Sequence, residues 1–198
     1  MTVRTSHILM VLSAFLAGLV IFLGVFLFAT GHLGGGGPGP SAIGGPFNLI
    51  DQDGKQITDA DLKGKPFLVF FGYTHCPDVC PTTLFDLSEM MHALGKDADR
   101  ANALFISVDP ERDTPAVMKD YLSSFDPHLR AATGGEKAID AAEKAYRVYA
   151  KKVPGEHGDY SMDHTALVYL MDKQGRFVAP FSLKRRPEES AADLRKYM

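Results

Sequence analysis

The sequence predicts an α/β domain with a mixed sheet flanked by helices and an N-terminal hairpin, preceded by one transmembrane helix. Three observations predict this class: a long uncharged apolar run near the N-terminus, a Gly- and Pro-rich segment after it, and buried strands alternating with helices in the remainder. Because a domain usually takes ~100–200 residues, the chain has room for one domain and an appendage.

Residues 8–30 are predicted to form a transmembrane anchor. They contain no charged residue, and 19 of the 23 are apolar. As a helix the run would span ~35 Å, enough for a hydrocarbon core of ~30 Å, whereas a cleaved signal peptide, the alternative, has an apolar region of only ~7–15 residues. Arg4 precedes the run and the next basic residue is Lys55. The positive-inside rule therefore predicts a single-pass protein of the cell inner membrane, with residues 1–7 in the cytoplasm and the domain in the periplasm.

Residues 31–46 are predicted to be a tether between this anchor and a domain over residues 47–198. Eight glycines and three prolines occupy these sixteen positions. Such a composition does not pack a core and has a random-coil reach of ~20 Å. A domain held in this way can search the membrane surface nearby, which suits a partner in the same membrane.

The first half of the domain reads as a hairpin, a buried strand and a helix. Residues 47–50 and 55–58 flank a Gly-containing turn, which is typical of a hairpin. The continuous apolar run over residues 66–72 predicts a buried central strand. Pro81 occupies the first turn of the following helix, where its missing N–H does no harm. Apolar residues then recur at helical spacing: Leu84, Leu87, Met91 and Leu94.

The second half of the domain continues this alternation. Residues 103–108 predict a second buried strand, and a helix is expected from Thr114-Pro115. Thr133 and Glu136 have the spacing of a capping box ahead of a helix that runs through Tyr149. Further elements are expected in this order: a third strand over 165–171, a turn over 172–175, a strand over 176–181 and a helix from Pro187.

This order of elements is the layout of a thioredoxin-like domain. The crossover rule places the second strand parallel to and beside the first. Every acidic residue of the chain and 20 of its 21 basic residues lie beyond position 50, and the two signs are mixed. Because a nucleic-acid-binding protein would need a basic face, nucleic acid is excluded as a partner.

The chemistry is expected at Cys76 and Cys80, directly after the central strand and at the start of a helix. Ligand sites gather at the carboxyl ends of such strands, and a helix N-terminus favours thiolates. We therefore expect low-pKa, partly exposed cysteines. Their spacing of i and i+4 allows both sulfurs to face one point. Spacing alone leaves a redox pair, a metal site and a structural disulfide all open.

A metal site needs a third ligand, and His164 before the third strand is the candidate. Two thiolates and an imidazole suit copper or zinc and exclude magnesium and calcium. His75 and Met162 are weaker candidates. Asp163 and Asp78 are candidates to support the ligands from outside, although a backbone carbonyl serves an imidazole equally well. For Asp109 and Asp113 we favour turn and cap chemistry ahead of the helix at Thr114.

Three motifs resemble the Sco/SenC family of copper chaperones. They read Phe71-Gly-Tyr-Thr-His-Cys-Pro-Asp-Val-Cys-Pro81, Ser107-Val-Asp-Pro-Glu-Arg-Asp-Thr-Pro115 and Asp163-His164-Thr165. The resemblance covers residues 42–198. It implies a thioredoxin-like fold that binds copper, as Cu(I) or Cu(II), through Cys76, Cys80 and His164. It also implies that Cys76 and Cys80 form a redox-active disulfide.

The resemblance further implies a role in assembling the binuclear copper site of cytochrome c oxidase subunit II. We expect a metallochaperone rather than an enzyme, with that subunit or another cuproprotein as recipient and a separate copper donor protein. The alternative is a thiol–disulfide oxidoreductase that reduces the cysteines of a periplasmic partner. Thioredoxin-type redox enzymes carry a cis-proline where this sequence has Asp163-His164-Thr165, and that difference favours the metal site.

Overall fold

The computed structural model describes residues 2–29 and 43–198, except for the side chains of residues 2–9, 11, 27–29 and 157. The chain divides into two compact units, Met1–Pro40 and Ser41–Met198. The first contains helix α1, Thr2–Ala29. Within the part that the structure describes, no helix meets the length and hydropathy needed to cross a membrane, so the transmembrane anchor predicted over residues 8–30 is not confirmed. Most of the predicted tether, residues 31–42, lies outside the described residues.

The second unit is built on a seven-stranded mixed sheet with the strand order β2-β1-β5-β4-β3-β8-β9. β3, β4 and β5 run parallel, and the other neighbours are antiparallel. The strands are β1 Asn48–Asp51, β2 Gln56–Thr58, β3 Phe67–Gly72, β4 Asn102–Ser107, β5 Leu129–Thr133, β8 Val168–Met171 and β9 Phe177–Pro180. This confirms the predicted hairpin, the mixed sheet and the pairing of the first two buried strands.

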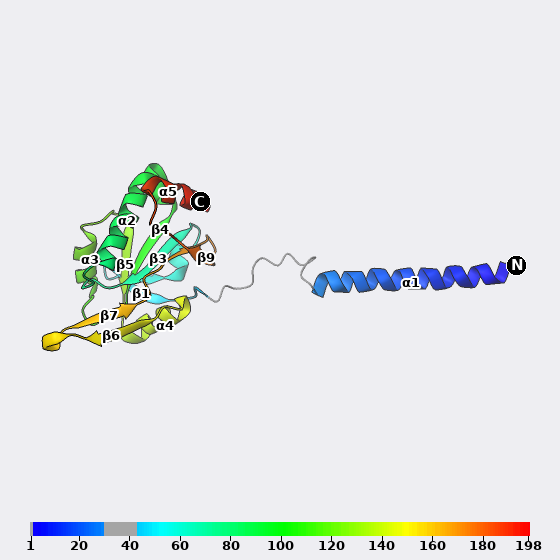
Figure 1. Ribbon diagram of the computed structural model, residues 1–198, viewed down its shortest axis with the longest axis horizontal. Coiled ribbons are helices and arrows are strands. Elements are labelled where there is room, and N and C mark those ends of the chain that lie inside the picture. The colour runs from blue at the N-terminus through cyan, green and yellow to red at the C-terminus, as the bar shows by residue number, and fades with distance from the viewer. Residues whose placement is uncertain (1, 30–42) are drawn as a thin grey trace. The chain divides into compact units, whose positions relative to one another are not determined.

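Helices cover the sheet, and α2 packs against α5 (Figure 1). The helices are α2 Val79–Leu94, α3 Pro115–Leu122, α4 Glu136–Tyr146 and α5 Pro187–Arg195, with short 3₁₀ turns at Asp59–Leu62, Gly95–Arg100 and Glu156–Gly158. Every residue of β3 is buried, as its apolar run predicted. The Phe70 ring stacks on Phe105 of β4 at 5.8 Å between centroids, so aromatic packing joins the two central strands.

A two-stranded hairpin, β6 Ala150–Pro154 and β7 Tyr160–His164, extends away from the main sheet (Figure 1). The sequence did not predict this hairpin, and the third strand was expected over 165–171, whereas β8 begins at Val168. No position of β6 or β7 is buried, so neither strand has the apolar run that made the central strands recognisable. The hairpin matters because His164 is its last residue.

The predicted capping box at Thr133 and Glu136 is wrong. Thr133 belongs to β5, where it pairs with Ile50 of β1, and its hydroxyl has no hydrogen-bond partner among the described residues. The N-cap of α4 is Gly135, and the helix ends at Tyr146 rather than Tyr149. Strand pairing across the sheet therefore outweighs the local capping signal.

Glu143 of α4 provides a pH-dependent test of the fold. Burial, and next the charge of Asp140, raise the pKa of the Glu143 carboxyl from its ordinary 4.5 to about 7. A carboxyl with a raised pKa in the folded state costs nothing below its unfolded pKa and destabilises the fold increasingly until pH passes the folded pKa. We expect Glu143→Gln to raise the free energy of unfolding by about 1 kcal/mol at pH 8, after allowance for solvent screening, and to change it little at pH 4.

Urea denaturation at several pH values checks this. Glu89→Gln, at an exposed position of α2, is the matched control for replacing a helical glutamate by glutamine. A gain for Glu143→Gln that is equal at pH 4 and pH 8 would show that ionisation of the buried carboxyl is not its cause.

Candidate metal centre

Cys76 and Cys80 lie where β3 gives way to α2. β3 ends at Gly72, a loop follows, and Cys80 is the second residue of α2. The backbone N–H of Cys80 donates to Cys76 Sγ at 3.4 Å, which holds the two sulfurs on the same side of the turn. Cys76 is half-buried, whereas Cys80 is fully buried. The pair therefore has one sulfur toward solvent and one toward the core.

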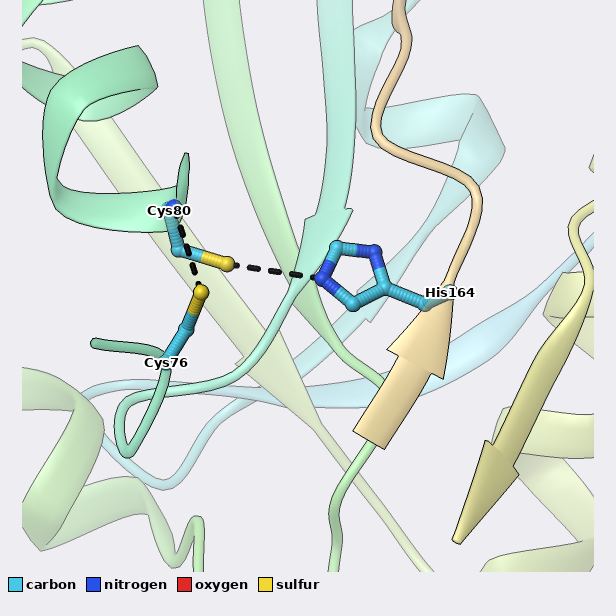
Figure 2. Close-up of side chains that lie close together, drawn as sticks. All are labelled: Cys76, Cys80 and His164. Atoms are coloured by element: carbon cyan, nitrogen blue, oxygen red, sulfur yellow. Dashed lines mark hydrogen bonds between the residues drawn. The ribbon is translucent and has the colours of Figure 1, made fainter. Parts of the chain in front are cut away.

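His164 reaches this pair from the end of β7 (Figure 2). Its Nε2 lies 3.6 Å from Cys80 Sγ, and one ligand atom from each of the three residues lies within 4.8 Å of the others. Figure 2 shows the imidazole edge directed at the two sulfurs. The structure thus brings together the three residues that the sequence proposed as metal ligands, from segments 84 residues apart.

The imidazole is oriented by the backbone. Nδ1 donates to the carbonyl oxygen of Thr165 at 3.3 Å, which leaves Nε2 without a proton in the neutral ring and free to face the sulfurs. Tyr73 packs edge-on against the ring at 5.8 Å between centroids. The carbonyl takes the role for which Asp163 was a candidate.

Burial controls the protonation of this centre. Burial lowers the pKa of the His164 imidazole, opposed by its hydrogen bond to Thr165 and by the charge of Asp163. Burial also raises the pKa of the Cys80 thiol far above its ordinary value. The expectation of two low-pKa, partly exposed cysteines is therefore wrong for Cys80, because the side chain lies in the core beyond the reach of solvent.

Two sulfurs and one imidazole nitrogen form a soft donor set. Such a set selects copper or zinc over magnesium or calcium, which prefer oxygen. Because a metal binds the thiolate form, an ion must displace the proton of Cys80 on entry. Three ligands also leave one side of the ion open. The arrangement can therefore hold a soft ion and exchange it through the half-buried Cys76.

A buried carboxylate, Asp113, secures the loop that carries Cys76. Its oxygens accept from the Thr74 hydroxyl at 2.6 Å, the Thr74 N–H at 3.1 Å and the Ser107 hydroxyl at 2.6 Å. Asp113 thus ties the cysteine loop to the end of β4. The interpretation of Asp113 as a cap is wrong: Thr114 caps α3, and its hydroxyl accepts from the N–H of Val117.

We expect Asp113→Asn to loosen this loop, because an amide has one acceptor atom for three donors. The free energy of unfolding should fall by about 1–3 kcal/mol, the cost of buried donors losing a charged acceptor. Hydrogen exchange at the Thr74 N–H should quicken more than the mean of β3. Asp120→Asn, at an exposed position of α3, is the control. An unchanged Thr74 exchange rate would contradict the assigned role.

Arg112 fastens the hairpin that carries His164. Its guanidinium lies 3.6 Å from the Tyr160 ring centroid and donates to the Tyr160 carbonyl at 3.0 Å. Asp109 accepts from Arg112 Nε and, at 2.8 Å, from the Tyr160 hydroxyl. The segment after β4 therefore holds both halves of the site. Asp113 binds the cysteine loop, and Asp109 and Arg112 together bind the start of β7.

The remaining sequence candidates lie outside the ligand group. Asp163 and Asp78 are exposed, and neither carboxylate is hydrogen-bonded in the described part of the chain. His75 is exposed and its Nδ1 lies 3.1 Å from the Thr74 hydroxyl, while Met162 packs against the core. The sequence left a backbone carbonyl open as the partner of the imidazole, and the Thr165 carbonyl has that role. It did not reveal the Asp113 anchor, because a contact across 39 residues leaves no local signal.

Comparison with known proteins places this geometry in a family. The SCO1/SenC family model matches residues 36–198. A "SCO2-like protein" of Rickettsia felis is 40% identical over 149 residues, which cover 74% of this chain and 73% of the relative.

Two similar solved structures are of copper-bound proteins. ScoI of Bradyrhizobium japonicum "with copper bound" is 68% identical with a TM-score of 0.78, covering 79% of this chain and 99% of that one. Yeast Sco1 "with copper bound" is 37% identical with a TM-score of 0.72, covering 80% and 88% respectively. These likenesses confirm the predicted mixed α/β, thioredoxin-like fold.

Proposed function

The chain belongs to the SCO1/SenC family, and from this premise we propose that it is a copper chaperone. Its cargo is copper, held by Cys76, Cys80 and His164, and its recipient is the binuclear copper site of cytochrome c oxidase subunit II. The observation that carries the proposal is that the two sulfurs and Nε2 of His164 lie within 4.8 Å of one another, with Cys76 and His164 half-buried. The copper-bound relatives support the choice of ion.

The chain's residues divide the work of holding and releasing the ion. Cys80 holds copper from the inner side, where burial excludes water, and half-buried His164 completes the site. Cys76 is the ligand that an incoming thiolate of the recipient displaces first, because its sulfur is the more accessible one. The thiol protons leave for solvent on loading and return when the ligands are released.

Oxidation of the two thiols removes the site. Forming a Cys76–Cys80 disulfide releases two protons and two electrons to an acceptor and leaves no thiolate for copper. The thiol–disulfide oxidoreductase alternative uses this same pair. We do not favour it, because thiol exchange has no need of an oriented imidazole 3.6 Å from the buried sulfur.

Copper titration of the purified, reduced chain tests the proposal, with Cu(I) and Cu(II) added separately against a chromophoric competitor. We expect a single tightly bound ion, none after oxidation with a mild disulfide-forming reagent, and transfer to the apo copper domain of subunit II. If the chain bound no copper but exchanged disulfides rapidly with that domain, the chaperone proposal would be wrong and the thiol reductase alternative would be favoured.

The proposal includes attachment to the inner membrane through residues 8–30, with the domain in the periplasm. The uncharged apolar run and the single Arg4 before it support this orientation. Protease treatment of spheroplasts tests it: digestion of the domain from outside is expected, and protection of the domain would contradict the assignment. The protein that donates copper is expected on the same side.

A further inference from the structure

A groove opens beside the metal centre, between the first two turns of α2 and the segment after β9. Its volume is about 540 Å³. α2 contributes Val79, Thr82 and Asp86, and the opposite wall contains Leu167, Phe181 and Leu183. The first wall begins at Asp78 and Val79, between the two cysteines, and the second begins two residues after His164. Both walls therefore start in the chain segments that carry the metal ligands, although none of the three ligands lines the groove itself.

The surface of the groove is apolar although threonines line it. Val79 is 46% exposed and Leu167 45%, so each wall presents an aliphatic side chain to solvent. The hydroxyls of Thr82 and Thr83 donate to the carbonyls of Asp78 and Val79 within their own helix. Because both hydroxyls are already hydrogen-bonded, a ligand in the groove would contact mainly the carbon atoms of this wall.

One carboxylate in the groove lacks a counter-charge. Asp86 is half-buried and has neither a hydrogen bond nor an ion pair in the described part of the chain. Burial raises the pKa of its carboxyl, and no nearby cation opposes that effect. Asp78 adds a second carboxylate to the lining, and Lys184, which also lines the groove, forms no ion pair with either carboxylate among the described residues. A cationic group on a ligand would form the ion pair that Asp86 lacks.

We propose that this groove docks a segment of the copper-receiving protein, and that the segment carries an apolar side chain next to a lysine or arginine. The apolar side chain covers Val79 and Leu167, and the cation faces Asp86. Docking there holds the recipient's thiolates at the open side of Cys76. The inference rests on the proposed function and adds to it the surface that selects the partner.

Association with the purified copper domain of subunit II tests the inference, with the full chain in detergent and in both its apo and copper-loaded forms. We expect Asp86→Lys to raise the dissociation constant for the subunit II domain at least about tenfold, because it reverses a charge at the interface. Copper binding should be unchanged. Asp120→Lys, on α3 and outside the groove, is the matched control and should associate like the unmodified chain.

Crosslinking gives a second measurement that does not depend on a charge reversal. A benzophenone side chain introduced at Thr82 should crosslink the subunit II domain, and one at Asp120 should not. Equal association of Asp86→Lys and the unmodified chain, or crosslinks from Thr82 only to a second copy of this chain, overturns the inference. So does copper binding without any association.

Failure of the proposed function looks different. If the chain binds no copper, the chaperone proposal is wrong. Association of the apo chain with the subunit II domain, compared with that of Asp86→Lys, still tests whether the groove is a docking site.

Discussion

Replacing His164 with alanine is expected to weaken copper binding by the reduced protein at least about a hundredfold, since losing even an outer partner of a metal ligand costs about 10–100-fold. Nε2 lies 3.6 Å from Cys80 Sγ, and no other imidazole lies in the described ligand group. The variant retains two sulfurs, one of them buried, and has no nitrogen donor to complete the set. Competition titration with Cu(I) and Cu(II) measures the change.

His75→Ala is the matched control for this prediction. His75 is next to Cys76 in sequence, is exposed and lies outside the ligand group, so its removal should change copper affinity by less than about threefold, the scatter expected of an outer residue. Disulfide exchange by His164→Ala should persist. If both histidine variants bind copper as the unmodified protein does, the imidazole is not a ligand and the chaperone proposal loses its third donor.

The second large effect is expected at Gly72, the last residue of β3. A Cβ at this position would lie 2.7 Å from Cys80 Sγ and 2.9 Å from Phe105 Cε2. Both neighbours are buried and both distances are too short for contact with a Cβ, so Gly72→Ala forces the sulfur as well as the ring to move. Overpacking of this kind costs about 1–3 kcal/mol. Because the sulfur that must move faces His164, copper affinity should fall as well, by about tenfold or more.

Gly135→Ala is the control, since a Cβ there meets nothing within 4 Å and the backbone φ is −69°. It should lower the free energy of unfolding by at most about 1 kcal/mol, the cost of a poorer N-cap. Denaturant unfolding and copper titration on both variants provide the comparison. If Gly72→Ala unfolded and bound copper as the unmodified protein does, the missing Cβ at Gly72 would not be needed to position the Cys80 sulfur.

Much of the fold follows from local pattern. The continuous apolar run over residues 66–72 predicted a buried strand, and the periodic apolar residues from Leu84 to Leu94 predicted the helix after it. Burial on both faces gives a strand a continuous apolar run, and burial along one face gives a helix apolar residues at helical spacing, so both elements are recognisable. The hairpin β6–β7 has no buried position and no such apolar run, and it was missed for that reason.

The site divides in the same way. Cys76 and Cys80 lie four residues apart at a strand–helix junction, which marked them as the reactive pair but left redox, metal and structural roles open. His164 was the candidate third ligand, and the family resemblance implied copper binding by all three residues. The support around these ligands was not evident. Asp113 was interpreted as a turn or cap residue ahead of the helix at Thr114, but its carboxylate binds Thr74, 39 residues earlier in the chain. Thr133 was interpreted as a cap because Glu136 follows it at the spacing of a capping box, and it proved to be part of β5.

The sequence by itself determined the order of the central elements, the soft donor set and the family. The tertiary structure alone decided that Cys80 is buried while Cys76 is half-buried, that Asp113 anchors the cysteine loop, and that a groove with an unpaired Asp86 lies between α2 and the segment after β9. The reason is physical: periodicity and spacing record interactions between near neighbours in the chain. Burial, protonation and hydrogen bonding at this centre arise from segments that only folding brings into contact.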